Sequence, residues 1–213
     1  MKRIISILGG TFNPIHNGHL LSANRLLQEM HLKNIFLLPN NIPPHKLIRN
    51  IKNKHRLIMI KLAISNFTNL GINLLEIKDK KISYTFDTLV KIRRKIGKSI
   101  SLIFIIGEDN LYEIYKWENW EKFLNLCHIV VIPRKVKLVK KVQDSILSWV
   151  NTYKIDDFSI FSYCSSGYIF FSNIKQENIS SSKIRNCIKK KKIYKQFVPI
   201  KVYQYIKKNK LYL

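Results

Sequence analysis

Short apolar runs rich in β-branched residues alternate with longer segments of helical period along this chain. The runs are apolar on both faces, as strands buried in a parallel sheet are, whereas half-solvated strands alternate polar and apolar residues. This alternation is typical of βαβ units and predicts an α/β fold built on a parallel sheet. The expected strands are 4–8, 34–38, 73–77, 101–106 and 129–132.

Helical segments fill the intervals between these runs. Residues 18–30 carry apolar side chains at spacings of three and four, and 56–65 and 85–96 carry similar stripes. Two stretches, 9–17 and 39–53, are expected to be loops at the carboxyl ends of strands, where open α/β sheets bind their ligands. We therefore expect a Rossmann-like, doubly wound parallel sheet.

The alternation of apolar runs and helical segments ends at the basic stretch 134–141. Beyond it, the pattern predicts a helix near 142–151, an aromatic strand-like run over 158–171 and two short helices that end in Lys-rich turns. No internal repeat is visible, and 213 residues suffice for one domain with a substantial core. We expect a single domain over 1–213, comprising the main α/β sheet in 1–134 and a helical carboxyl-terminal cap in 135–213.

The chain is strongly basic, because 38 Lys and Arg against 13 Asp and Glu give a formal net charge of +25. Clustered basic residues would indicate nucleic-acid binding through the release of phosphate counterions. Here the lysines are scattered over every segment, and Lys, Ile and Asn are abundant throughout, as A- and T-rich codons produce. We favour this compositional interpretation over a nucleic-acid partner, although a positive field also attracts small polyanionic substrates.

Three cysteines, Cys127, Cys164 and Cys187, share no CxxC spacing, so neither a disulfide framework nor a cysteine-rich zinc site is expected. The first apolar run stops at Gly9 without the cleavage site of a signal peptide. No uncharged run approaches the ~18 residues that a membrane span needs. These features predict a soluble, cytoplasmic protein without a membrane partner.

The strongest local signal is the string GGTFNPIHNGHL over 9–20, between the first expected strand and the first expected helix. A glycine pair lets backbone N–H groups approach an anion, and the following helix points its positive dipole end at the same place. His16 and His19 lie three residues apart and can face one ligand. The string predicts a phosphate-binding loop, whereas either feature alone would indicate a tight turn with surface histidines.

Four further motifs follow in order, and with the first string they extend from residue 9 to residue 185. They are PNNIPPHK at 39–46, SYT at 83–85, IIGED at 105–109 followed by Trp117, and ISSSKIR at 179–185. With these motifs the chain resembles the nucleotidyltransferase superfamily that shares a His-x-Gly-His element with class I aminoacyl-tRNA synthetases. Within that superfamily, it resembles the bacterial nicotinate-nucleotide adenylyltransferases.

The resemblance implies adenylyl transfer, in which the 5′-phosphate of nicotinate mononucleotide attacks the α-phosphate of ATP and gives deamido-NAD and pyrophosphate. Such a reaction depends on positioning and charge neutralisation rather than on a protein nucleophile. Because the sequence shows no carboxylate cluster, we expect Mg²⁺ to be held mainly by ATP, with no protein metal site. The alternatives are a pantetheine-phosphate or nicotinamide mononucleotide adenylyltransferase, a cytidylyltransferase and, from another class, a basic RNA-binding protein.

The resemblance also implies roles at the phosphates. His16 and His19 would contact the triphosphate, with His19 stabilising charge on the α-phosphate in the transition state. The Arg185 guanidinium would hold the β- and γ-phosphates, beside Ser181 or Ser182 at a helix N-terminus that could equally be a plain cap. Lys46, on a loop stiffened by prolines, would add a phosphate contact. The expected catalytic residues are His16, His19, Lys46 and Arg185.

For the pyridine ring, the resemblance implies that Trp117 stacks on it while backbone N–H groups near Thr85 and Glu118 donate to its carboxylate. Neutral amide donors would favour the acid over the nicotinamide form. The spacing of Trp117, Trp120 and Phe123 by itself indicates an amphipathic helix packed on a core, and we expect core packing for the last two.

Asp109, just after an apolar strand, is expected to contact ATP or the nucleotide sugar, with helix capping as the alternative. Asn13 departs from the family pattern, because bacterial members commonly have Asp there. Asn keeps the acceptor oxygen and the size but loses the charge. The expected substrate-binding residues are Gly9, Gly10, Thr11, Phe12, Asn40, Tyr84, Thr85, Gly107, Asp109, Trp117, Ser181 and Ser182.

Overall fold

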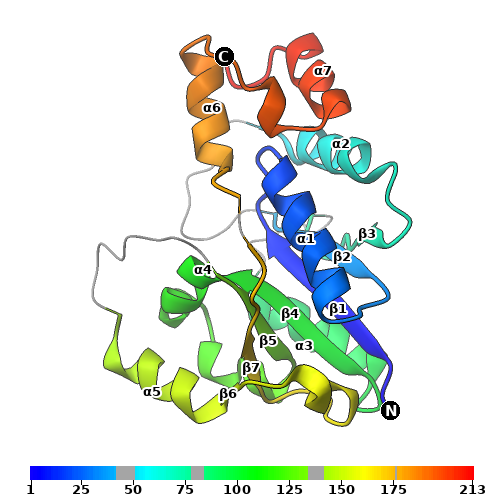
Figure 1. Ribbon diagram of the computed structural model, residues 1–213, viewed down its shortest axis with the longest axis vertical. Helices are drawn as coiled ribbons and strands as arrows, with labels where there is room; N and C mark the ends of the chain where they lie inside the picture. Colours follow the sequence, from blue (N-terminus) through cyan, green and yellow to red (C-terminus); the bar gives the residue numbers. More distant parts are fainter. Residues whose placement is uncertain (42–50, 78–83, 134–141, 176) are drawn as a thin grey trace.

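The computed structural model describes residues 1–41, 51–77, 84–133, 142–175 and 177–213 (Figure 1). Within these ranges the strands form one seven-stranded parallel sheet in the order β3-β2-β1-β4-β5-β7-β6. The expected α/β parallel-sheet class is confirmed. The strands are β1 (Ile4–Gly10), β2 (Ile35–Pro39), β3 (Leu70–Ile72), β4 (Ser101–Gly107), β5 (His128–Ile132), β6 (Lys154–Ile155) and β7 (Ile169–Phe171).

The strand order reverses at β1, which lies beside the central strand β4. From β1 the chain first builds outward through β2 and β3, then returns to place β4 on the other side of β1. Connections that leave adjacent strands toward opposite faces open a crevice at their carboxyl ends, which is where doubly wound sheets bind ligands. The carboxyl ends of β1 and β4 are therefore where a site is expected.

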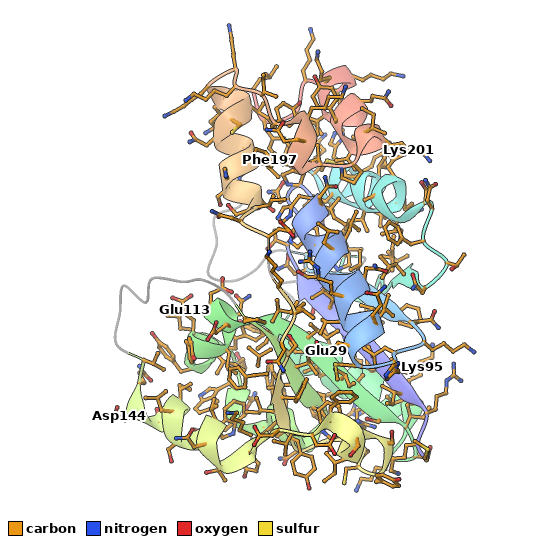
Figure 2. All side chains as sticks on the ribbon, viewed as in Figure 1. Glu29, Lys95, Glu113, Asp144, Phe197 and Lys201 are labelled. Carbon is orange, nitrogen blue, oxygen red and sulfur yellow. The ribbon has the colours of Figure 1, made fainter. Side chains whose placement is uncertain are left out.

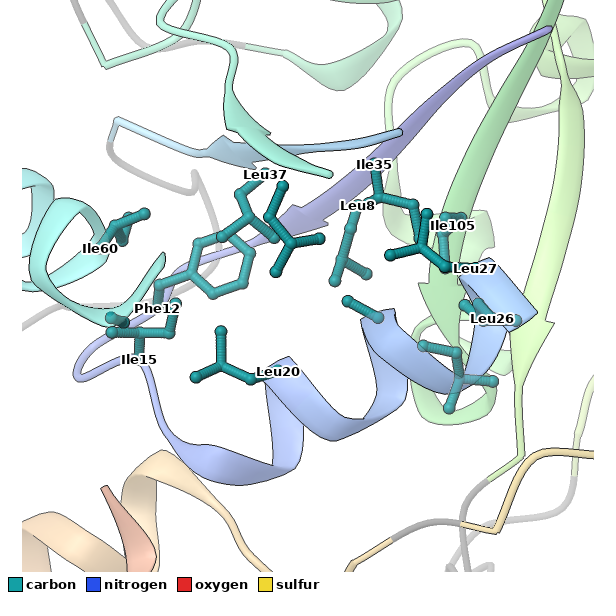
Figure 3. Packing of buried hydrophobic residues seen from close by; sticks show 14 of the residues in the cluster. Leu8, Phe12, Ile15, Leu20, Leu26, Leu27, Ile35, Leu37, Ile60 and Ile105 are labelled. Carbon is teal, nitrogen blue, oxygen red and sulfur yellow. The ribbon is translucent and has the colours of Figure 1, made fainter. Parts of the chain in front are cut away.

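Helices cover both faces of the sheet, and the burial of the strand residues follows this arrangement. In β1, Ile7 belongs to the cluster that holds α3 (Thr85–Ile96) and α5 (Asp144–Tyr153), whereas Leu8 belongs to the cluster that holds α1 (Asn17–Glu29). Figure 3 shows the second cluster, with side chains of α1 facing those of the strands: Leu20, Leu26 and Leu27 against Leu8, Ile35 and Ile105. Strands buried on both faces explain why the sequence runs are uniformly apolar.

The part expected to be a helical cap, 135–213, also supplies β6 and β7 to the main sheet. Its last helices, α6 (Ser181–Lys189) and α7 (Ile200–Lys208), lie at one end of the molecule in Figure 1, and Phe197 and Lys201 are labelled there in Figure 2. Helix α7 packs on α2 (Asn53–Ile64), where His55 Nδ1 lies 2.9 Å from the Tyr205 hydroxyl. Val202 and Ile206 are buried in the same cluster as α1. None of the described helices is both long and apolar enough to cross a membrane.

One expected strand is wrong. Residues 73–77 form no strand, and β3 lies just before them at Leu70–Ile72. The Asn73 N–H still donates to Leu37 O at 2.8 Å, but its side-chain oxygen then accepts from the Leu75 N–H at 3.0 Å. This side-chain bond turns the backbone away from the sheet edge, as Asx turns do.

Two aromatic segments also differ from expectation. The run 158–171 is mostly not a strand: the Asp157 carboxylate accepts from Ser159 N at 2.9 Å and starts a 3₁₀ helix, Phe158–Ser162, before β7. The stripe from Trp117 to Phe123 is not one helix either. Trp117 is extended between the 3₁₀ helices Ile114–Lys116 and Trp120–Asn125, and Asn119 has a left-handed φ of 52° that breaks the helical period.

Candidate active site

A cavity of 1220 Å³ opens at the carboxyl ends of β1 and β4, the place that the strand order indicates. Every expected site residue that the structure describes lines it, although the residues come from five separate segments of the chain. Lys46 lies outside the described residues. The residues brought together are Gly9, Gly10, Thr11, Phe12, His16, His19, Asn40, Tyr84, Thr85, Gly107, Asp109, Trp117, Ser181, Ser182 and Arg185.

Gly9 and Gly10 were expected to belong to a loop, but they are the last two residues of β1. They are required by close approach: a Cβ on Gly9 would lie 2.9 Å from the Phe104 ring, and one on Gly10 would lie 2.8 Å from the Phe12 ring. Both rings line the cavity. The glycine pair thus admits two aromatic side chains beside the strand end, where any larger residue would clash.

Phe12 makes the turn after β1 with a φ of 48°, in the left-handed region that favours glycine. A non-glycine residue there costs roughly 1–3 kcal/mol and persists only where its surroundings fix it. The Phe12 side chain is 1% exposed, and its ring meets the edge of the His19 ring at a centroid distance of 5.0 Å. Burial of this ring therefore holds the turn that presents the histidines.

The two histidines stack on each other, with ring centroids 3.6 Å apart and planes 23° apart. His16 precedes α1 and is buried, and its backbone N–H donates to His19 Nδ1 at 3.3 Å. Because Nδ1 accepts this bond, the proton of a neutral His19 ring resides on Nε2. The loop thus fixes the tautomer that can donate a hydrogen bond from Nε2.

The N-terminus of α6 is tied directly to the first loop. Ser181 Oγ donates to Pro14 O at 2.9 Å, and Arg185 Nη1 donates to Asn13 O at 2.7 Å. Arg185 Nη2 also donates to Ser182 Oγ at 3.1 Å. The helix cap is Ser180, which accepts from the Lys183 N–H at 3.1 Å, so neither Ser181 nor Ser182 serves as the cap. A positive helix end and a guanidinium therefore face the same cavity.

At the end of β4, Gly107 precedes the short helix α4 (Glu108–Tyr112), and Asp109 lies within it. The residue at the cap position is Gly107, so capping does not account for Asp109. Asp109 lines the cavity at the end of β4, the strand that pairs with β1.

Trp117 is half-buried on the cavity wall, with its ring 6.4 Å from Phe104 and 6.0 Å from Phe123. Thr85, the first residue of α3, lines the cavity with it, as does the exposed Glu118. Phe123 is buried in the core as expected. Trp120 packs outside the cavity against Trp149, with ring centroids 5.2 Å apart.

Two residues that contact the first loop, Tyr212 and Arg56, belong to no motif that the sequence reveals. The Tyr212 hydroxyl donates to Asn13 Oδ1 at 2.7 Å, and residues 210–213 line the cavity. Burial raises the pKa of Tyr212, an effect that the nearby positive charges of Arg185 and Arg56 only partly offset. Arg56, in α2, is buried behind the first loop and donates to Thr11 O at 2.8 Å. Both contacts join distant segments, which no local pattern reveals.

Among the described residues, no group of three or more His, Cys, Asp or Glu side chains is placed to hold a metal ion. The donors of the cavity are instead suited to anions: a guanidinium, two imidazoles and the N–H groups of helix N-termini.

Comparison with solved structures supports the fold. The nicotinic acid mononucleotide adenylyltransferase of Plasmodium falciparum, solved with NaAD, superposes with a TM-score of 0.73 at 21% identity, covering 99% of this chain and 97% of that one. The same enzyme complexed with APC gives a TM-score of 0.70 at 22% identity, covering 100% and 98% of the two chains. The Rossmann-like architecture is therefore confirmed.

Sequence comparison supports the family. The cytidylyltransferase-like family model matches residues 7–187. A protein of Buchnera aphidicola subsp. Acyrthosiphon pisum (strain 5A), named probable nicotinate-nucleotide adenylyltransferase, is 42% identical over 100% of this chain and 98% of its own. A protein of the same name from Serratia proteamaculans is 34% identical over 84% and 82% of the two chains. The chain thus belongs to the cytidylyltransferase-like family and, within it, to the nicotinate-nucleotide adenylyltransferases.

Proposed function

We propose that the chain transfers the adenylyl group of ATP to nicotinate mononucleotide, giving deamido-NAD and pyrophosphate in NAD biosynthesis. The observation that carries this function is that all the expected site residues described by the structure line one cavity. The histidine loop and the α6 N-terminus, which line this cavity, would hold the phosphates, and Trp117 with the start of α3 would hold the acidic aromatic ring. One cavity can therefore hold both substrates with their phosphates facing each other.

The reaction is a displacement at the α-phosphorus. An oxygen of the nicotinate mononucleotide 5′-phosphate forms a bond to that phosphorus, and the bond from it to the bridging oxygen of pyrophosphate breaks. The His19 Nε2–H donates to a non-bridging α-phosphate oxygen, where negative charge develops in the transition state. His16 packs against His19 and, through its backbone N–H, keeps that ring in the donating tautomer.

Arg185 and the α6 N-terminus would hold the β- and γ-phosphates. The guanidinium is already oriented by Asn13 O and Ser182 Oγ, so little side-chain freedom is lost when phosphate binds. Charge on departing pyrophosphate is stabilised by the same groups, because they remain in contact with it as the bond breaks.

The proposed pocket for the pyridine ring explains why nicotinate mononucleotide would be preferred over its amide form. Trp117 offers a stacking face, and backbone N–H groups at Thr85 and Glu118 would donate to the carboxylate. The amide of the nicotinamide form would bring N–H donors against these donors, leaving buried groups unpaired. The Glu118 side chain is exposed, so its charge can point away from the bound acid.

Mg²⁺ would enter with ATP, coordinated by phosphate oxygens and water. The donor set fits this arrangement, since Asp109 supplies one carboxylate on the cavity wall and the described residues offer no cage. When bound, the ion neutralises phosphate charge. We expect the reaction to occur in the cytoplasm, where the three free cysteines stay reduced.

A substrate panel tests the proposal. The protein is incubated with ATP and Mg²⁺ plus nicotinate mononucleotide, nicotinamide mononucleotide or phosphopantetheine, and both pyrophosphate and the joined nucleotide are measured. We expect nicotinate mononucleotide to be used at least about tenfold more efficiently than the others, because the wrong partners leave donors unpaired. A preference for phosphopantetheine, or no transfer to any acceptor, would refute it.

A further inference from the structure

Arg56 combines near-complete burial with a set of hydrogen bonds that spans the site. Its side chain, on the first turn of α2, is 1% exposed and is not among the residues that line the cavity. Nη1 donates to Thr11 O at 2.8 Å, and Nη2 donates to Asn40 O at 2.6 Å and to Asn41 O at 2.9 Å. One guanidinium therefore joins the loop after β1 to the segment after β2.

Side-chain contacts strengthen this junction. Arg56 Nη2 donates to Asn53 Oδ1 at 2.5 Å, and Asn53 Nδ2 donates in turn to Asn41 Oδ1. Asn40 Nδ2 donates to Thr11 Oγ1 at 3.2 Å, and the Asn40 N–H donates to Gly10 O at 3.1 Å. The two strand ends that line the cavity are thus fixed at one separation by a buried network with Arg56 at its centre.

The charge of Arg56 is unusual in this setting. Its hydrogen-bond partners among the described residues are neutral carbonyl and amide oxygens, and burial lowers its pKa. A buried cation without a carboxylate partner is costly to keep, so neutral residues would make a better plain scaffold. A cation is useful here because it draws the carbonyl oxygens of Thr11, Asn40 and Asn41 toward itself. Those oxygens would otherwise be available to face, and repel, bound phosphate.

We propose that Arg56 is a positioning residue for adenylyl transfer: it turns three peptide carbonyls away from the phosphates and fixes the spacing of the two loops that hold the reacting groups. The inference rests on the proposed function, because the spacing of the two loops affects the rate only if adenylyl transfer takes place between them. Since misplacement of reacting groups by about 1 Å can cost about 10²-fold in rate, loss of the network should lower kcat more than it raises KM.

Arg93 supplies a matched control. It also gathers several carbonyls, donating to Gly97 O and Ile100 O at 2.7 Å, to Leu126 O at 2.6 Å and to Ser165 O at 2.7 Å. These contacts are away from the cavity, and Arg93 does not line it. Arg93→Lys therefore removes a comparable guanidinium network of purely structural value.

The experiment compares Arg56→Lys with Arg93→Lys and the unmodified protein, with kcat, both KM values and thermal melting measured. Lysine keeps the charge but loses the planar fork that reaches several carbonyls at once. For Arg56→Lys we expect kcat to fall by about 10²-fold, with each KM changing less than about tenfold. Arg93→Lys should lower the melting temperature and leave kcat of the folded protein within about threefold. Similar kcat values for both variants would overturn the inference.

A second variant guards against misfolding of Arg56→Lys. Asn53→Asp has nearly the same shape but gives Arg56 a carboxylate, which should draw Nη2 from the carbonyls of Asn40 and Asn41 because charge-assisted bonds are about twice as strong. We expect kcat to fall about tenfold in a protein that stays folded, because the new ion pair offsets the lost bond from Asn53 Nδ2 to Asn41 Oδ1. An unchanged kcat would also overturn the inference. An unmodified protein that fails to transfer adenylyl groups would instead refute the proposed function, so the two failures are distinguishable.

Discussion

One backbone hydrogen bond fixes the tautomer of His19. The His16 N–H occupies Nδ1 and so assigns the imidazole proton to Nε2. The neighbouring ring of Phe12 limits how far the imidazole can rotate. A donor that is already oriented needs no reorganisation when charge develops on the α-phosphate, which is the condition for strong transition-state stabilisation.

His19→Ala should therefore lower kcat by at least about 10²-fold, the usual loss for one transition-state donor. His31→Ala is the matched control, because His31 lies just past the other end of α1 and is exposed. Steady-state kinetics with circular dichroism would check the effect. Near-normal turnover by a folded His19→Ala protein would remove the histidine loop from the chemistry.

In the proposed function Trp117 would stack on the ring while backbone N–H groups would bind the carboxylate, so a change at Trp117 should affect only the first. Trp117→Ala should raise KM for nicotinate mononucleotide by about one to two powers of ten, as stacking on an aromatic ring is worth roughly 1–3 kcal/mol. The preference for acid over amide should persist. Trp120→Ala, which removes a ring packed on Trp149 outside the cavity, is the control. If Trp117→Ala leaves KM unchanged, the ring is only part of the core.

The sequence predicts those strands and helices whose formation depends only on the local pattern of apolar residues. The strands at 4–8, 101–106 and 129–132 were predictable because each is apolar on both faces and buried between helix layers. The strand predicted at 73–77 is wrong because one hydrogen bond to the Asn73 side chain turns the backbone there. The helix predicted through Trp117 is wrong because Trp117 is extended and Asn119 has a left-handed φ between the two 3₁₀ helices.

The sequence predicted those residues of the candidate site that belong to contiguous motifs. The motif residues could be named because each motif is contiguous, and their convergence follows from the strand order. Arg56 and Tyr212 could not be named, because their role lies in contacts with segments 15 and more residues away. Such contacts appear only when the elements are packed.

The segment after α7 is an element of the site in its own right, joined to the first loop by Tyr212. Tyr212→Phe would leave Asn13 Oδ1, in a side chain that is 6% exposed, without this donor. We expect the free energy of unfolding to fall by about 1–3 kcal/mol, the cost of an unpaired buried acceptor, and turnover with ATP to fall with it. Denaturant titration beside Tyr163→Phe, an exposed tyrosine, would measure the loss. Equal stability of the two variants would contradict the prediction.

Across the whole molecule, charge and burial set the response to pH. His128 is buried at the start of β5 between the rings of Phe161 and Tyr168, and its Nε2 donates to Cys164 O at 3.1 Å. Burial lowers its pKa from 6.5 to about 4. Between these values the unfolded chain binds a proton that the folded chain does not, so the folded state loses stability as the pH falls.

The loss between pH 6.5 and pH 4 should reach roughly 3 kcal/mol, the free energy of the pKa difference. His128→Phe keeps a ring between the two aromatic neighbours but cannot titrate, so its stability should decline less over this interval. Denaturant titrations of both proteins at pH 7, 5.5 and 4.5 would give the two slopes. Parallel slopes would show that other groups govern the acid response.

The cavity is lined by residues of the first loop together with residues from two later stretches, 177–185 and 210–213, that contact this loop through Ser181, Arg185 and Tyr212. During synthesis the histidine loop is translated before Arg185 and Tyr212, which contact it. A nascent chain therefore has the sheet centre and its histidines without a complete phosphate site. A chain that stops before residue 185 therefore lacks the guanidinium that donates to Asn13 O in the first loop, and we expect it not to transfer adenylyl groups.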